Sequence, residues 1–150
     1  MDKMRLVKKL IRKYGTNNPF ELCEYLDFIV VKAPLSGIRG CCQRKQKNTI
    51  IYIDSRLPEY VQLFVCAHEL YHALCHKDLN RLYMDTYTLM VSSKYEIASN
   101  QFAVCLLYPD DSELYELLEM PIERAAAIMG VEISEAEYRL NLVVKQLEKV

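Results

Sequence analysis

Residues 61–76, VQLFVCAHELYHALCH, place histidines and a glutamate within an otherwise apolar stretch. The apolar pattern begins near Pro58, a residue suited to the first helical position, and predicts a long central helix. Inside a buried helix, His68, Glu69 and His72 would be costly to desolvate without partners. The chain must therefore fold so that a metal ion or other polar groups meet these three side chains.

The chain contains three histidines, His68, His72 and His76, at intervals of four residues on this helix. Residues four apart are neighbours on a helix face, with Cβ atoms about 5–6 Å apart, so two imidazoles can bind one metal ion. Glu69 lies one step round the helix, where it can accept a proton from a water molecule at the metal. HExxH also occurs by chance in proteins without metal, but the apolar surroundings and the small number of histidines favour a metal site.

A catalytic zinc site uses three protein ligands and leaves one position open. His76 has suitable chemistry, but eight residues rise about 12 Å along a straight helix. Two metal–nitrogen bonds of roughly 2.1 Å cannot span that distance together with a central histidine. We therefore assign His76 to packing, or to a supporting role behind the ligands at the mouth of the site.

Glu96 is the best candidate for the third ligand. It lies 24 residues after His72, in the first turn of a helix predicted to run from Ser93 to about Leu107. Asn100, one turn later on the same face, would orient the ligands by hydrogen bonding. The alternative is that Glu96 only caps its helix, because Ser93 and Glu96 have the spacing of a capping box.

The rest of the chain predicts an α+β fold, with a small three-stranded sheet packed on the central helix and further helices at both ends. Helices are expected at 1–14 and 19–26, and strands at 28–31, 41–45 and 49–54, the last two joined as a hairpin. Residues 79–92 are ambiguous between loop and strand. Near the end of the chain, Gly130 ends one helix, and Ser134 with Glu137 caps the last.

Composition narrows the class of protein. The 150 residues carry a net charge of −1, with 51% hydrophobic and 26% charged residues, which is typical of a globular domain. No apolar run approaches the roughly 20 residues of a membrane span, and the amino-terminal stretch lacks the apolar core of a signal peptide. We therefore expect a cytoplasmic protein without membrane partners, whose six cysteines, none in a CxxC pair, are small buried side chains.

Two blocks of the sequence resemble one known family. Residues 68–76, HELYHALCH, resemble the HELGHxLLH motif of the ImmA/IrrE metallopeptidases. Residues 96–109, EIASNQFAVCLLYP, resemble their ExxANxFAAxLLMP block, and GTNNPFELC near the start and Tyr138-Arg139-Leu140 near the end are also similar to the family. Tyr71 and Ser99 depart from the usual glycine and alanine. We expect Tyr71 to pack on the sheet, and the alternative is that it crowds the site.

The resemblance implies a zincin-like minimal metallopeptidase of the gluzincin type. His68, His72 and Glu96 would bind Zn²⁺, with another divalent ion such as Mn²⁺ as the alternative. Glu69 would be the general base, and Asn100 would support the ligands. Family members cleave helix-turn-helix repressors of phages and mobile elements and thereby relieve repression, so the resemblance implies an endopeptidase with such a repressor as its partner.

We expect this activity in a single metallopeptidase domain of residues 1–150. Within it, 1–27 would form amino-terminal helices, 28–110 the sheet and the two ligand helices, and 111–150 a helical cap.

Two other functions fit parts of the sequence. A metal-stabilised protein could sequester the repressor without cutting it, and Tyr71 keeps that alternative open. Residues 122–142 have a helix–glycine–helix order loosely like a helix-turn-helix. Residues 121–150, however, hold four basic and five acidic side chains, whereas a duplex-binding face should be basic. We therefore expect no direct nucleic-acid binding. The basic face of residues 1–14 could grip an acidic partner, although a solvated surface explains it more simply.

Overall fold

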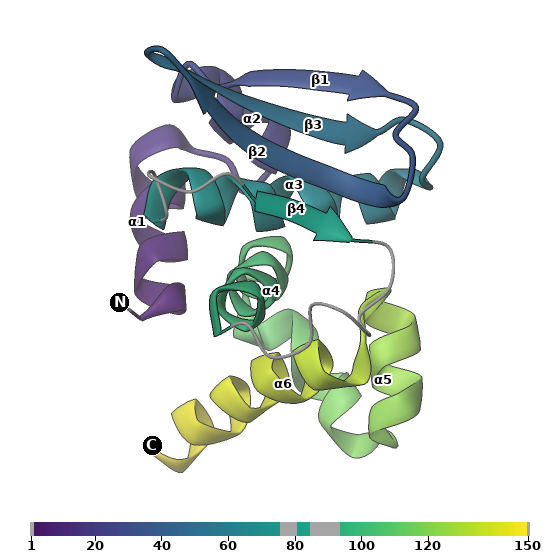
Figure 1. Cartoon of the computed structure of the whole chain (residues 1–150). Coiled ribbons are helices and arrows are strands. Elements are labelled where there is room, and N and C mark those ends of the chain that lie inside the picture. The colour runs from purple at the N-terminus through teal and green to yellow at the C-terminus, as the bar shows by residue number, and fades with distance from the viewer. Residues whose placement is uncertain (1, 76–80, 85–93, 150) are drawn as a thin grey trace.

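The computed structural model describes residues 2–75, 81–84 and 94–149. A mixed sheet covers one side of the central helix α3 (Glu59–Cys75), and helices α4, α5 and α6 lie on the other side (Figure 1). The α+β class and the packing of a small sheet on the central helix are confirmed. His76 lies outside the described residues. Within the described part of the chain, no helix has the length and apolar character that crossing a bilayer requires.

Helices α1 (Lys3–Tyr14) and α2 (Pro19–Tyr25) form where the sequence predicts them. The Asp2 side chain caps α1 by accepting two backbone N–H groups of its first turn. Asn18 accepts a backbone N–H at the start of α2 in the same way. Gly15 ends α1 with φ at 74°, in the left-handed region that favours glycine.

The sheet has the strand order β1-β3-β2-β4. Its strands are β1 (Ile29–Ala33), β2 (Ile38–Lys45), β3 (Asn48–Asp54) and β4 (Arg81–Met84). β1 runs parallel to β3, and β2 runs antiparallel to both β3 and β4. The predicted hairpin is present, with Lys45 opposite Asn48. The short strand β4 makes the sheet one strand wider than expected. It comes from the ambiguous segment, where four residues are too few for a clear alternating pattern.

Strand β2 approaches α3 most closely at Gly40. A Cβ atom at this position would lie 2.7 Å from Val65 Cγ1 and 2.8 Å from the Tyr52 carbonyl oxygen. It would also lie 3.6 Å from Glu69 Cγ. Because real Cβ atoms do not approach other atoms below 3.0 Å, only glycine fits here. Gly40 therefore sets the distance between the sheet and the helix that carries the HELYH motif.

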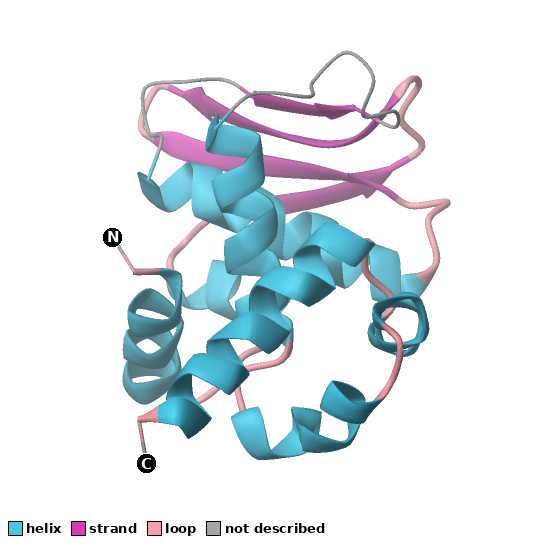
Figure 2. Ribbon diagram, turned by 90° about the horizontal axis from the view of Figure 1, so that it is seen from below, coloured by secondary structure: helices cyan, strands magenta, loops and turns pink. Residues whose placement is uncertain are grey.

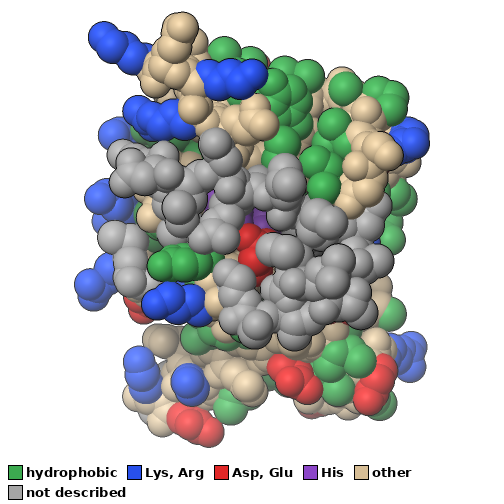
Figure 3. Space-filling view, viewed as in Figure 1, with side chains coloured by type: hydrophobic (Ala, Val, Ile, Leu, Met, Phe, Trp, Pro, Cys, Tyr) green, Lys and Arg blue, Asp and Glu red, His purple; other side chains and the backbone are tan. Residues whose placement is uncertain are grey.

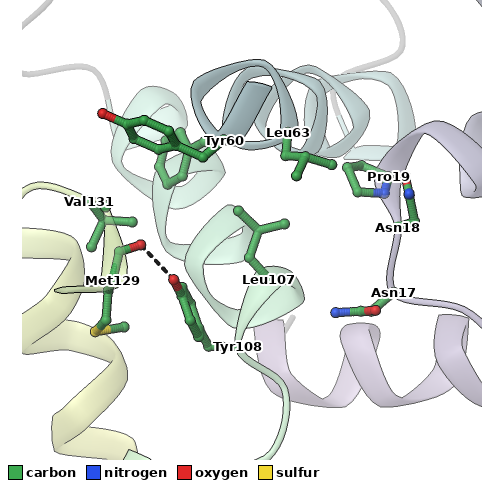
Figure 4. Close-up of a pocket in the computed structure, with 11 residues that line it drawn as sticks. Asn17, Asn18, Pro19, Tyr60, Leu63, Leu107, Tyr108, Met129 and Val131 are labelled. Carbon is green, nitrogen blue, oxygen red and sulfur yellow. Dashed lines mark hydrogen bonds between the residues drawn. The ribbon is translucent and has the colours of Figure 1, made fainter. Parts of the chain in front are cut away.

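Helix α4 packs against α3 on the side away from the sheet. It spans Lys94–Leu107 and is followed by a 3₁₀ helix, η1 (Asp111–Glu119), α5 (Ile122–Met129) and α6 (Ile133–Glu148) (Figures 1 and 2). The fully buried Arg139 of α6 donates to the Tyr108 carbonyl at 2.7 Å and to the Asp111 carboxylate at 2.6 Å. The Tyr108 hydroxyl donates to the Met129 carbonyl at 2.6 Å (Figure 4). These bonds fix α5 and α6 to the end of α4.

One buried hydrophobic cluster connects the sheet, the amino-terminal helices and the helices beyond α4. Its fully buried members include Val7, Leu22, Ile51 and Phe102. Five of the six cysteines are free and buried, whereas Cys75 is exposed. The prediction that the cysteines are buried hydrophobic side chains is confirmed for those five.

The start of α6 was predicted two residues too late. The N-cap residue is Glu132, not Ser134. Glu135, not Glu137, stands three residues after this N-cap, and the backbone N–H groups of Glu132 and Glu135 act to lower the pKa of its carboxyl. Glu135 is buried in this position. That burial, assisted by the charge of Glu132, raises the pKa of the Glu135 carboxyl to about 7.

Glu135 should make the folded state less stable as the pH rises. A carboxyl whose pKa is raised on folding gives stability that is fully present below its ordinary pKa of 4.5 and is lost as the pH approaches 7. Glu135→Gln keeps an acceptor for the N–H groups but cannot ionise. The variant should exceed the parent in unfolding free energy by up to about 3 kcal/mol near pH 8 and by much less near pH 4. Urea unfolding measures the difference in unfolding free energy between variant and parent at each pH. Equal differences at pH 8 and pH 4 would contradict the prediction.

Gly40→Ala should destabilise the protein by about 1–3 kcal/mol, because the added methyl group must displace Val65 or the β3 backbone. Gly40→Val should cost more, since it places two further carbon atoms in the same contact. The urea midpoints of the two variants measure this order. Variants that unfold at the parent's midpoint would show that the sheet can move away from α3 freely.

Candidate metal centre

Helix α3 presents two imidazole rings towards α4. His68 is fully buried and His72 is 1% exposed, and their Nε2 atoms lie 3.2 Å apart. Two ligand atoms at about 2.1 Å from a tetrahedral zinc ion are roughly 3.4 Å apart. The separation of the two nitrogens therefore suits two ligands of one ion.

Glu96 reaches the same point from the first turn of α4. Its Oε2 lies 3.0 Å from His68 Nε2, and its Oε1 lies 2.9 Å from His72 Nε2. Among the described residues, these three form the one group of metal-binding side chains, with ligand atoms all within 4.8 Å of one another. Burial would raise the pKa of Glu96, but the hydrogen bonds and charges of the two histidines lower it below its ordinary value. Glu96 is thus ionised, the form that binds a cation.

The Glu96 carboxylate faces the two histidines in this arrangement. Ser93, its expected partner in a capping box, lies outside the described residues. The structure therefore keeps Glu96 among the candidate ligands, and the predicted capping box stays a prediction.

Asn100 holds His68 in one orientation. Its Oδ1 lies 2.7 Å from His68 Nδ1, and an amide oxygen can only accept, so Nδ1 carries the proton. The lone pair of Nε2 then points at Glu96 and His72, as a metal ligand requires. The sequence predicted Asn100 in this supporting position from its spacing after Glu96.

Ser99 contacts the second histidine, a role that the sequence analysis missed. Its Oγ lies 3.3 Å from Nδ1 and 3.2 Å from Nε2 of His72, and its hydroxyl donates to the Tyr95 carbonyl at 2.8 Å. An oxygen equally close to both ring nitrogens does not select one tautomer. The only sequence signal was that Ser99 replaces the alanine of the family motif.

Glu69 lies beside this group, on the side of α3 that faces Gly40. Its side chain is fully buried, and neither carboxylate oxygen has a hydrogen-bond partner among the described residues. Its Oε2 is 4.0 Å from His68 Nε2. Burial, assisted by the charge of Glu96, raises the pKa of Glu69 well above its ordinary value. A buried carboxyl without structural bonds is costly, and its position suits a group that exchanges protons.

Two cysteines of β2, Cys41 and Cys42, are near enough for the charge of Glu69 to affect their thiols, and neither belongs to the group of candidate ligands. Burial, and to a lesser extent the charge of Glu69, raises the pKa of Cys41, and the same two causes lead in raising that of Cys42 to about 12. Metal binding needs the thiolate form, so both remain neutral neighbours of the site.

Tyr71 packs on α4, and the prediction that it packs on the sheet was wrong. Its ring lies against that of Phe102, with centroids 5.0 Å apart, and it is buried. Tyr71 was correctly placed on the far side of the helix from Glu69. That far side faces α4, however, because Glu69 itself is the residue next to the sheet at Gly40.

Figure 3 shows the face of the molecule towards which the site lies. Acidic and histidine side chains are visible at the centre of that face, between the sheet above and the helices below. The pocket of Figure 4 is a separate feature of about 280 Å³, lined by residues of α3, α4 and the segments around α2 and α5. None of the candidate ligands lines it.

Comparison with known proteins agrees with this geometry. The family model described as the IrrE N-terminal-like domain, peptidase M78, matches residues 23–141, which include both ligand helices. The chain belongs to this family. Among its relatives, the uncharacterized immunity region protein 2 of Bacillus phage phi105 is 39% identical over 127 residues, covering 83% of this chain and 80% of that protein. Metallopeptidase ImmA of Bacillus subtilis strain 168 is 28% identical over 142 residues, covering 91% and 83%.

Membership of the M78 family makes the chain a relative of metallopeptidases. The His68, His72 and Glu96 group lies within the matched residues. The matched segment begins within α2 and ends within α6. Helix α1 and the last turns of α6 lie outside it.

Asn100 and Ser99 should differ in their effect on metal affinity. Asn100→Ala removes the acceptor that fixes the His68 tautomer, so zinc affinity should fall about 10–100-fold. Ser99→Ala removes an oxygen that fixes no tautomer and restores the usual family residue, so zinc affinity should stay within about threefold of the parent's. Competition with a chromophoric chelator measures both constants. Equal losses in the two variants would refute the assigned role of Asn100.

Proposed function

We propose that the chain is a zinc-dependent endopeptidase. The observation that carries this proposal is the convergence of His68, His72 and Glu96 on one point, with Glu69 buried beside it. We further propose that residues 1–150 act as one domain, since a single hydrophobic cluster joins the helices at both ends to the sheet.

The side chains present fit a divalent ion. Two neutral imidazoles and one ionised carboxylate are the ligand set of many hydrolytic zinc sites, and they leave a fourth position open. Glu96 Oε1 is buried and lies 2.9 Å from His72 Nε2, so the carboxylate would reach an ion bound by the two histidines. When bound, Zn²⁺ or Mn²⁺ would lower the pKa of water and polarise the scissile carbonyl.

Glu69 would move the protons of the reaction. Its raised pKa makes it a stronger base than an ordinary carboxylate, so it can accept a proton from the attacking water and return that proton to the leaving amine. Asn100 would keep His68 in one tautomer throughout, and the Tyr71–Phe102 contact would hold α3 against α4 while substrate binds.

We propose a helix-turn-helix repressor of a phage or mobile element as the substrate. Support comes from the two relatives, of which one is a phage immunity-region protein and the other a metallopeptidase. Cleavage of such a repressor would relieve repression.

The rival functions receive less support. Tyr71 was the reason to consider a protein that sequesters the repressor without cutting it, and its ring belongs to the α3–α4 contact. Helices α5 and α6, joined at Gly130, bear the mixed charges noted in the sequence, which suits a helical cap better than a duplex-binding face.

Glu69→Gln should retain bound zinc and the fold but lose cleavage by about 10²–10⁴-fold, because the amide cannot accept the proton. The assay incubates the purified variant with the repressor encoded beside its gene and follows fragments by gel electrophoresis. Glu135→Gln is the matched control, since it makes the same change at a buried glutamate outside the site, and it should cleave normally. A fully active Glu69→Gln variant would refute the proposed role of Glu69 as the general base.

Glu96→Ala should reduce the zinc content of the purified protein from about one ion per chain to a small fraction, because two histidines alone hold zinc weakly. Elemental analysis together with circular dichroism separates metal loss from unfolding. An unchanged zinc content in a folded variant would return Glu96 to the role of a helix cap.

A further inference from the structure

A groove of about 720 Å³ lies between α1 and α6, remote in sequence from the metal ligands. Residues of both helices line the groove, and α6 runs below α1 in the view of Figure 1. One wall carries Arg5, Lys8, Lys9 and Arg12, which share one face of α1. The other wall is formed mainly by the face of α6 that carries Arg139, Leu142, Lys145 and Gln146, followed by Lys149, and the remaining lining residues are Asp2, Met4 and Asp111.

The groove concentrates positive charge in a chain that has almost none overall. Its lining holds seven basic and two acidic side chains, a formal charge of +5, whereas the whole chain carries −1. The residues outside the groove therefore carry −6. Both acidic side chains are already engaged, because Asp2 caps α1 and Asp111 accepts a hydrogen bond from Arg139.

Six of the cations are exposed on the walls: Arg5, Lys8, Lys9, Arg12, Lys145 and Lys149. None of them forms an ion pair within the described part of the chain. Several stand three or four residues apart on the same helix, a spacing at which like charges destabilise the helix. The seventh, Arg139, is fully buried, and its Nη1 has no hydrogen-bond partner among the described residues. Arg139 is bonded to Tyr108 and Asp111, and Arg12 and Lys145 lie in the last turns of their helices, where positive charge is favourable. The six exposed cations nevertheless have no acidic partner among the described residues, which points to an external anion.

The groove lies largely outside the residues that the family model matches. The family model matches residues 23–141, so α1, Lys145 and Lys149 fall beyond it. All six exposed cations are therefore supplied by segments outside the peptidase match, and the metal site does not need them.

We propose that this groove binds an extended acidic segment of a protein partner. Its lining contains no aromatic side chain on which bases of a single-stranded nucleic acid could stack. Its cations line a concave surface, whereas a duplex is gripped by side chains that project towards its phosphates. The half-buried Met4 and Leu142 add apolar surface among the charges. A partner segment that combines carboxylate side chains with one aliphatic side chain would therefore match the groove. Helix α1, with 12 residues, is about 18 Å long, so a peptide of about six extended residues would span it.

Binding of a fluorescein-labelled peptide of about eight residues, rich in Asp and Glu with one central Leu, tests the proposal by fluorescence anisotropy. The parent protein should bind it at low salt and lose affinity as salt is added, because the contacts are exposed charge pairs. Lys8→Glu combined with Arg12→Glu should weaken binding by at least about tenfold. Thermal stability should change little, since relief of repulsion between like charges offsets the unfavourable glutamate in the last turn of α1.

Lys45→Glu with Lys47→Glu is the matched control, because it makes the same change of net charge in the β2–β3 hairpin, away from the groove lining. It should bind the peptide within about twofold of the parent, as should Glu69→Gln, whose catalytic defect is independent of the groove. Three outcomes would overturn the proposal: no binding by the parent at low salt, equal loss in the hairpin control, or tighter binding of a labelled oligothymidylate of matched charge than of the peptide.

Discussion

The contact between α3 and α4 depends on four polar side chains in a place where the fold otherwise puts apolar ones. His68, His72, Glu69 and Glu96 are all buried between the sheet, α3 and α4. Two carboxylates this close repel each other, and the charge of Glu96 is one cause of the raised pKa of Glu69. A cation shared by the ligands would offset that repulsion. The same group that suits catalysis therefore also decides how tightly the two central helices can pack.

The two carboxylates differ because their surroundings differ. Glu96 meets two imidazoles and keeps its charge, whereas Glu69 meets apolar atoms and holds its proton more tightly. Opposite pKa directions in neighbouring carboxyls are what the proposed roles, Glu96 as ligand and Glu69 as proton carrier, require. Positions on both sides support the difference: Gly40 lets β2 close over Glu69, and Asn100 fixes His68 from α4. Arg139 then anchors the end of α4 through the Tyr108 carbonyl.

The local features of this site could be predicted from the sequence, whereas several features of its surroundings could not. HELYH and Glu96 were predicted from spacing and residue chemistry, and the structure brings them together because helix periodicity is a local property. Tyr71 was misplaced because the sequence does not say which side of α3 the sheet covers. The cap of α6 was displaced by two residues because both Ser134 and Glu132 offer plausible starts. The α1–α6 groove could not be predicted, because its walls come from opposite ends of the chain and the sequence does not show that these segments meet in space.

Asp2 and Lys149, close to the two ends of the chain, both line the groove. An acidic linker fused beside Asp2 or Lys149 would therefore compete for the groove, whereas a basic one would add to its attraction for an acidic ligand. The turn between β2 and β3, which contributes no residue to the groove, is a better position for a label or a surface tether. Preparations of this protein that differ only in the end that carries the tag need not behave alike.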